Sequence, residues 1–144
     1  MVKYDENVWG PHFWFVLHSV SLTYPPHPNA ITKRKYYDFI MNLPLFLPNE
    51  KMGNKLFELF NTYPVQPYLD NPDSFYRWTW FIHNKINKQL NKPEISIEES
   101  LEMYFTHYQP KSTSLSETLK IKKGLLYALF VVFFMVIIYI SYSH

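Results

Sequence analysis

An uncharged run near the C-terminus constrains the fold more than any other feature of this sequence. From Leu125 to Ile140, 16 consecutive positions carry no charge and no strong polar group, and the run reaches 19 residues between Gly124 and Tyr142. A helix of that length spans the hydrocarbon core of a bilayer. The alternative, a buried core helix, would be shorter and would show a polar side. We therefore predict a transmembrane helix over residues 124–142.

The residues before this run predict its orientation. Lys120, Lys122 and Lys123 precede it directly, whereas only His144 follows as an ionisable side chain. The positive-inside bias then keeps the globular part on the cytoplasmic side of a single-pass membrane protein. Residues 107–123 are polar, rich in Ser and Thr and lack a core pattern, so we expect a linker there.

Residues 1–106 remain for one globular domain. Eleven prolines lie between the apolar runs and would cut the chain into short helices, and no alternation typical of strands stands out. Aromatic residues make up 19% of the chain against three glycines, so the core is expected to consist largely of rings. The sequence predicts an all-α fold, a small bundle of about five helices, followed by the transmembrane helix.

Helix-capping residues mark several starts. Asp5 or Asn7 can cap a first helix with Pro11 in its first turn, Asn49 can cap a third helix, and Ser96 with Glu99 has the spacing of a capping box.

The stretch Phe75 to Pro93 reads as one helix with two faces. At helical spacing it carries an apolar stripe, namely Phe75, Trp78, Ile82, Ile86 and Leu90. Beside it runs a polar and aromatic stripe, namely Trp80, His83, Asn84, Asn87 and Asn91. Such a flank suits a flat ligand with polar edges. The alternative is the solvated face of a bundle helix that happens to be rich in Asn.

The N-terminal helix repeats this design. It has a core stripe, namely Phe13, Val16, Leu17, Val20 and Tyr24, and Trp14 and His18 lie four residues apart on its flank. For Trp14 and His18 alone, ordinary packing is the simpler interpretation. Two helices of this kind side by side would line a cleft with rings and polar edges.

Charge and cysteine content exclude several classes of function. A formal charge of +2, spread along the chain, gives no support for nucleic-acid binding. There is no cysteine, which excludes disulfides, thiolate metal sites and cysteine nucleophiles. We predict no metal site and no catalytic residue.

Two motifs resemble one known family. The run WGPHFWFVLH, from Trp9 to His18, resembles the WGxxxWxxLH opening of the FAD-linked sulfhydryl oxidases, the Erv/ALR family. The run HNKINKQLNKP, from His83 to Pro93, resembles that family's HNxVNxxLxKP signature, with Ile86 in place of Val. The resemblance covers roughly Val8 to Phe105 and implies a helical bundle that holds FAD between its helices. The implied FAD-binding residues are Gly10, Trp14, His18, His83, Asn84, Asn87 and Lys92, with Lys92 near the diphosphate.

The redox positions depart from this resemblance. Where the family has a C-x-x-C disulfide beside the flavin, this chain has Asn49 and Met52. The family's second disulfide, spaced C-x16-C, maps to Trp80 and Ile97, an apolar pair that could replace the bond by packing. Neither an amide nor a thioether can form a thiolate or a disulfide, so dithiol oxidase activity is expected to be lost.

Three functions are compatible with these residues. The first is a membrane-anchored structural or interaction module that retains a flavin-capable cleft, associated with a virion membrane or capsid as in the forms that large DNA viruses carry. The second is an FAD-dependent thiol oxidase that acts without its own CxxC shuttle. The third is a tail-anchored adaptor whose motifs only pack. The partners expected are the membrane, virion or capsid proteins and, because family members often dimerise, a second copy of the chain.

Overall fold

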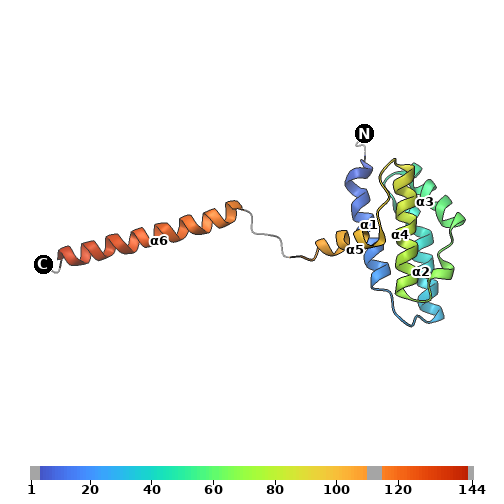
Figure 1. Cartoon of the computed structure of the whole chain (residues 1–144), viewed down its shortest axis with the longest axis horizontal. Coiled ribbons are helices and arrows are strands. Elements are labelled where there is room, and N and C mark those ends of the chain that lie inside the picture. Colours follow the sequence, from blue (N-terminus) through green and yellow to red (C-terminus); the bar gives the residue numbers. More distant parts are fainter. Residues whose placement is uncertain (1–3, 110–114, 143–144) are drawn as a thin grey trace. The chain divides into compact units, whose positions relative to one another are not determined.

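A computed structural model describes residues 4–109 and 115–142 of the chain. Every regular element in these ranges is a helix, and no strand occurs in them, which confirms the predicted all-α fold. The elements are α1 (Glu6–Leu22), α2 (Ala30–Asn42), the 3-10 turn η1 (Leu43–Phe46), α3 (Glu50–Thr62), the 3-10 turn η2 (Gln66–Tyr68), α4 (Pro72–Gln89), α5 (Ile97–Thr106) and α6 (Leu115–Tyr142). Helices α1 to α4 run alongside one another and α5 crosses them (Figure 1).

The predicted caps begin the helices. The Asp5 carboxylate accepts a hydrogen bond from the backbone N–H of Asn7, and Asn49 caps α3 in the same way through Met52. Ser96 and Glu99 form the complete capping box of α5. One detail was wrong: Pro11 lies inside α1, beyond its first turn, because the Asp5 cap starts the helix already at Glu6.

Helix α4 supplies the centre of the core. Phe75, Trp78, Ile82 and Ile86, from its predicted apolar stripe, are buried, and Leu90 at its end is half-buried. Helix α1 packs chiefly along α4. The stripe of α1 was less well predicted, because Val16 lies at its edge and remains 47% exposed.

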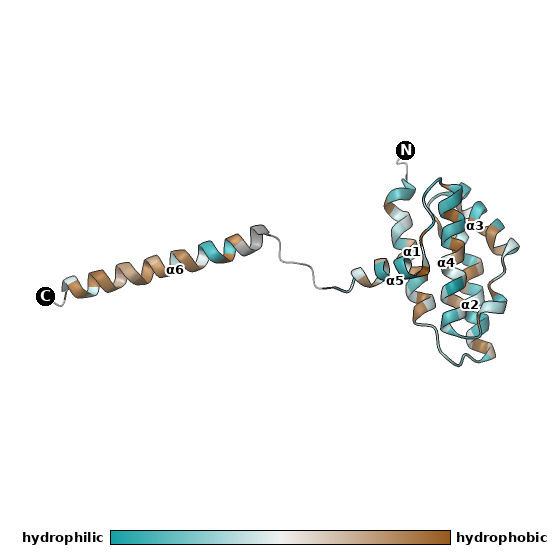
Figure 2. Ribbon diagram, viewed as in Figure 1, coloured by the Kyte–Doolittle hydropathy of each residue, from teal (hydrophilic) through white to brown (hydrophobic). Residues whose placement is uncertain are grey.

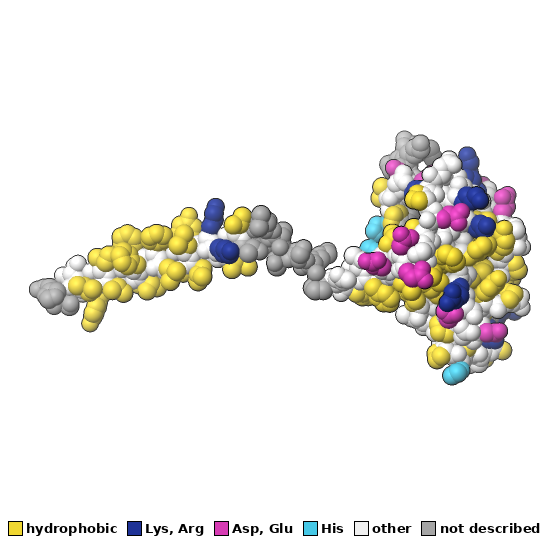
Figure 3. Space-filling view, viewed as in Figure 1, with side chains coloured by type: hydrophobic (Ala, Val, Ile, Leu, Met, Phe, Trp, Pro, Cys, Tyr) yellow, Lys and Arg dark blue, Asp and Glu magenta, His cyan; other side chains and the backbone are white. Residues whose placement is uncertain are grey.

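Helix α6 belongs to a second unit of the chain, which divides after Tyr108. Its segment Leu119–Tyr142 is long and apolar enough to cross a membrane. Hydrophobic residues cover this helix except near its start, where lysines lie (Figures 2 and 3). The helix begins at Leu115, so residues 115–123 of the predicted linker are helical, whereas residues 110–114 of that linker lie outside the described part.

Candidate functional site

A cavity of about 400 Å³ opens between α1 and α4. Its walls are completed by the start of α3, by α5 and by the segment that joins α4 to α5. The lining is mostly apolar and aromatic with a few polar groups, and both its size and its composition are typical of small-molecule sites. Six of the seven residues predicted to bind a cofactor line it, namely Gly10, Trp14, His18, His83, Asn87 and Lys92.

The flanks of α1 and α4 meet at the wall of this cavity, as the sequence predicted. The rings of Trp14 and His83 stack with centroids 4.0 Å apart and planes inclined by 10°. His18 Nε2 lies 3.1 Å from His83 Nδ1, within hydrogen-bond distance. Residues 65 positions apart in the sequence therefore form one cluster of rings.

Burial keeps both histidines of this cluster neutral at pH 7. It lowers the pKa of His18 from 6.5 to about 4. It also lowers the pKa of His83 to about 3, with smaller contributions from the charge on His18 and from Lys92. A neutral imidazole has one donor and one acceptor nitrogen. When one ring donates to the other, the two remaining nitrogens, His18 Nδ1 and His83 Nε2, must therefore be one acceptor and one donor.

Two buried polar atoms at the cavity have no hydrogen-bond partner within the described part of the chain. They are Trp9 Nε1 and His18 Nδ1. A buried polar group without a partner costs free energy, so both atoms fit the polar edge of a bound ligand. Gly10 adds room, because a Cβ atom placed there would meet nothing within 4 Å. Trp9 was quoted in the family motif but was not among the predicted binding residues.

Asn84 and Lys92 have different surroundings from the other predicted residues. Asn84 does not line the cavity: its side chain donates to the carbonyl of Ile95 and accepts from the Ile95 N–H. Lys92 is exposed at the rim, where its Nζ donates to Asn7 Oδ1 over 3.0 Å. Asn84 is therefore bound to the protein backbone, and Lys92 is a cation at the entrance of the cavity.

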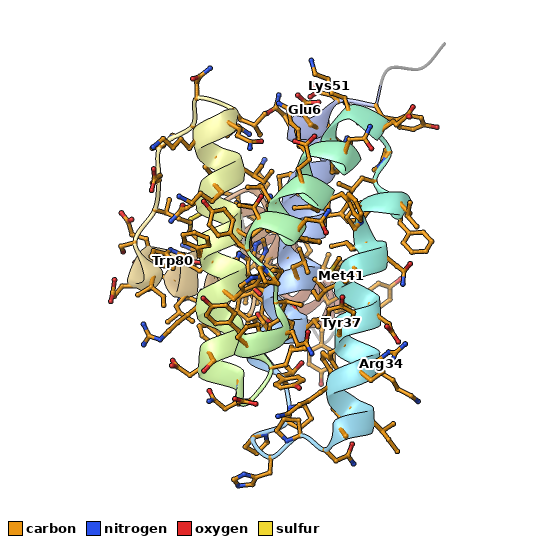
Figure 4. The ribbon with its side chains drawn as sticks, turned by 90° about the vertical axis from the view of Figure 1, so that its right-hand side faces the viewer. Glu6, Arg34, Tyr37, Met41, Lys51 and Trp80 are labelled. Carbon is orange, nitrogen blue, oxygen red and sulfur yellow. The ribbon has the colours of Figure 1, made fainter. Side chains whose placement is uncertain are left out.

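The start of α3 presents no redox group to the cavity. Met52 lines the wall and is 8% exposed. Asn49 caps α3 with its Oδ1 and donates from Nδ2 to Glu6 Oε2 over 3.2 Å. Figure 4 shows Glu6 at the N-terminal end of α1, close to the start of α3 where Lys51 is labelled.

Helix α5 contributes a side of the cavity that sequence reasoning missed. Tyr104 stacks on Phe15 of α1 with centroids 5.3 Å apart, and its hydroxyl lies 3.0 Å from Ser19 Oγ. The ring of His107, just after α5, makes a T-shaped contact with Phe15, with centroids 5.0 Å apart. These residues have no distinctive spacing in the sequence, since α5 lies more than 80 residues after its partners on α1.

Comparison with known proteins agrees with this arrangement. Residues 11–108 match the Erv1 / Alr family. This chain belongs to that family. It is 33% identical over 96 residues, 67% of this chain and 79% of the relative, to the FAD-linked sulfhydryl oxidase of African swine fever virus. It is 30% identical over 90 residues, 62% of this chain and 47% of the relative, to the mitochondrial FAD-linked sulfhydryl oxidase ERV1 of Saccharomyces cerevisiae.

The fold likewise resembles a solved structure of the family. The FAD-binding domain of Erv1 from Saccharomyces cerevisiae superimposes with a TM-score of 0.62, covering 72% of this chain and 93% of that domain at 23% identity. This likeness supports the arrangement of the helices. It does not extend to the redox cysteines of the family, because this sequence contains no cysteine.

Proposed function

We propose that this protein is a membrane-anchored, flavin-binding member of the Erv1 / Alr family that does not oxidise dithiols. The observation that carries the proposal is the contrast between an open cavity with orphaned polar atoms and a cavity wall in which Met52 stands where the family has a cysteine. The binding part of the site is preserved, and the electron-transferring part is replaced.

The cavity residues suit FAD. Trp14 and His83 offer ring faces, Trp9 Nε1 is a free donor, and His18 Nδ1 can pair with a polar edge. Lys92 at the rim provides a cation for the diphosphate. Asn84 acts indirectly, through the backbone that it holds. When bound, FAD supplies the capacity to accept two electrons from a thiol or another donor.

The chain itself has no group that could deliver those electrons. Thiol–disulfide exchange needs a thiolate as nucleophile and a disulfide as acceptor, and no residue of this sequence provides either. Asn49 is occupied by its bonds to the α3 backbone and to Glu6. A neutral histidine pair with a low pKa can orient a ligand and share a proton with it, but it cannot replace a thiol.

The surroundings that we propose are a membrane of a virus or of its host cell. Helix α6 is apolar enough to serve as the anchor, and its lysines favour the cytoplasmic side for the helical bundle. Relatives from large DNA viruses support a role at a virion membrane or with capsid proteins. Pairing of two copies is included in the proposal, with the exposed aromatic side chains as the available surface.

An absorbance spectrum of the full chain, purified in detergent and supplied with FAD, tests the cofactor. We expect flavin bands that remain with the protein after gel filtration. A colourless protein whose thermal unfolding FAD does not shift would overturn the flavin site.

Peroxide formation with dithiothreitol tests the missing activity. We expect no more peroxide than free FAD produces at the same concentration. Thiol-dependent peroxide that disappears in His83→Ala would instead establish the second function, an oxidase without its own shuttle.

A further inference from the structure

The segment between α4 and α5, residues 91–96, forms a strap along one wall of the cavity. It begins with Asn91, the one non-glycine residue of the described ranges with a left-handed backbone, at φ 54°. The backbone N–H of Lys92 then donates to the carbonyl of Asn87 over 2.8 Å. Lys92, Pro93 and Ile95 all line the cavity. The shape of the cavity therefore depends on where this strap is held.

Ile95 is the point at which the strap is fastened to α4. Its carbonyl accepts two hydrogen bonds, from Trp80 Nε1 over 2.9 Å and from Asn84 Nδ2 over 2.8 Å. Its N–H donates to Asn84 Oδ1 over 3.0 Å. Trp80 lies on the side of α4 next to α5 (Figure 4). Three hydrogen bonds to one residue, from two side chains one helical turn apart, make a rigid clamp.

From this geometry we infer that Trp80 and Asn84 are positioning residues, which shape the ligand cavity by clamping Ile95. Neither Trp80 nor Asn84 lines the cavity, so they act through the strap. The polar stripe of α4 thus serves two purposes: His83 and Asn87 face the cavity, while Trp80 and Asn84 hold its wall.

The clamp also explains how the fold does without the family's second disulfide. By resemblance, that disulfide maps to Trp80 and Ile97. Trp80 is part of the clamp, and Ile97 lies two residues after Ile95, the residue that the clamp holds. The sequence predicted that these two side chains could replace the bond by packing, and the structure adds a hydrogen bond from the Trp80 indole to the Ile95 carbonyl. The cavity wall is consequently held by bonds that no reductant can open, which suits the cytoplasmic side that we propose for the helical bundle.

Trp80→Phe tests this inference, because it removes the indole N–H and keeps an aromatic ring. We expect faster hydrogen exchange at the Ile95 amide in the full chain, by about tenfold, and an FAD affinity weaker by about tenfold. The affinity readout rests on the proposed function. The exchange readout does not, so it decides the clamp even if FAD fails to bind the unmodified protein.

Trp78→Phe is the matched control. Trp78 lies on the same helix, and its Nε1 also donates to a backbone carbonyl over 2.9 Å, that of Tyr63. Trp78 is more deeply buried, at 2% exposure, and neither it nor Tyr63 lines the cavity. We expect this variant to lower the melting temperature at least as much as Trp80→Phe while it leaves Ile95 exchange and FAD affinity unchanged.

A covalent rescue completes the test. With Trp80→Cys and Ile97→Cys together, the chain has one cysteine pair, and oxidation should return Ile95 exchange and FAD affinity towards those of the unmodified protein, with reduction reversing both. Equal effects of Trp78→Phe and Trp80→Phe on both readouts, or Ile95 exchange unchanged in Trp80→Phe, would overturn the inference.

Discussion

The face shared by α1 and α4 and the start of α3 border the same cavity, but only the first follows the motifs of the family. On the first, Trp14, His18, His83 and Asn87 keep the family's residue types and come together around open space. On the second, Asn49 and Met52 replace both redox cysteines with a helix cap and a buried thioether. In the function that we propose, the first face keeps its binding role because its residues also build the fold, whereas the second no longer transfers electrons.

Placing cysteines at the start of α3 should have the largest effect, because it would remove the difference between the two regions. In Asn49→Cys/Met52→Cys, a sulfur at position 52 would line the cavity, so we expect oxygen consumption with dithiothreitol more than about tenfold above that of Asn49→Ser/Met52→Ser. An oxygen electrode measures both. Equal rates in the two variants, with FAD bound, would mean that the cavity itself has lost its redox competence.

The two buried histidines of the cavity face should make the stability of the protein depend on pH. His18 and His83 have folded-state pKa values of about 4 and about 3, below the unfolded value of 6.5. Between the folded and the unfolded pKa values, the unfolded chain binds more protons than the folded chain. The free energy of unfolding is therefore highest above pH 6.5 and declines as the pH falls. The decline is at most about 1.4 kcal/mol per pH unit for each histidine. Urea unfolding between pH 7.5 and 4.5, followed by tryptophan fluorescence, measures the decline.

The control for this titration uses a histidine outside the cavity. His18→Gln/His83→Gln should flatten the pH dependence, whereas the exposed His27→Gln should leave it as it is. An unchanged slope in the double variant would show that other groups cause the acid sensitivity.

Substitutions at two glycines should distinguish the tightly packed start of α3 from the open cavity wall on α1. A Cβ at Gly53, next to Met52, would lie 2.5 Å from the backbone carbonyl oxygen of Pro44, so Gly53→Ala should lower the free energy of unfolding by about 1–3 kcal/mol. Gly10→Ala meets open space within α1 and should raise it by about 0.5–1 kcal/mol. Chemical denaturation measures both, and a destabilising Gly10→Ala would contradict the open cavity wall.

The cap at Asn49 is expected to contribute an effect of similar, small size. Asn49→Ala removes the cap of α3 and the bond to Glu6 and should cost about 1 kcal/mol. Asn49→Asp keeps a capping oxygen but places a second carboxylate beside Glu6, so its cost should fall in high salt. Salt-independent unfolding of Asn49→Asp would argue against contact between Glu6 and this position.

Several features of this protein follow from the sequence alone, because local rules govern them. Asp5, Asn49 and the Ser96–Glu99 pair begin helices through bonds to backbone atoms within three residues. The apolar stripe of α4 identified its buried face, and the uncharged run identified α6 as a candidate membrane helix. The absence of cysteine excludes a thiol or disulfide of the chain itself, and this conclusion needs no structure.

Only the tertiary structure decided how the polar stripe of α4 is shared. His83 turns to α1, whereas Asn84, its neighbour in sequence, clamps Ile95. Helical periodicity places both on one flank but says nothing about which partner each meets, since His83 meets α1 and Asn84 meets the strap. For the same reason, Phe15 and Tyr104 gave no signal. Such contacts join residues distant in the chain, and their energies depend on how whole helices pack.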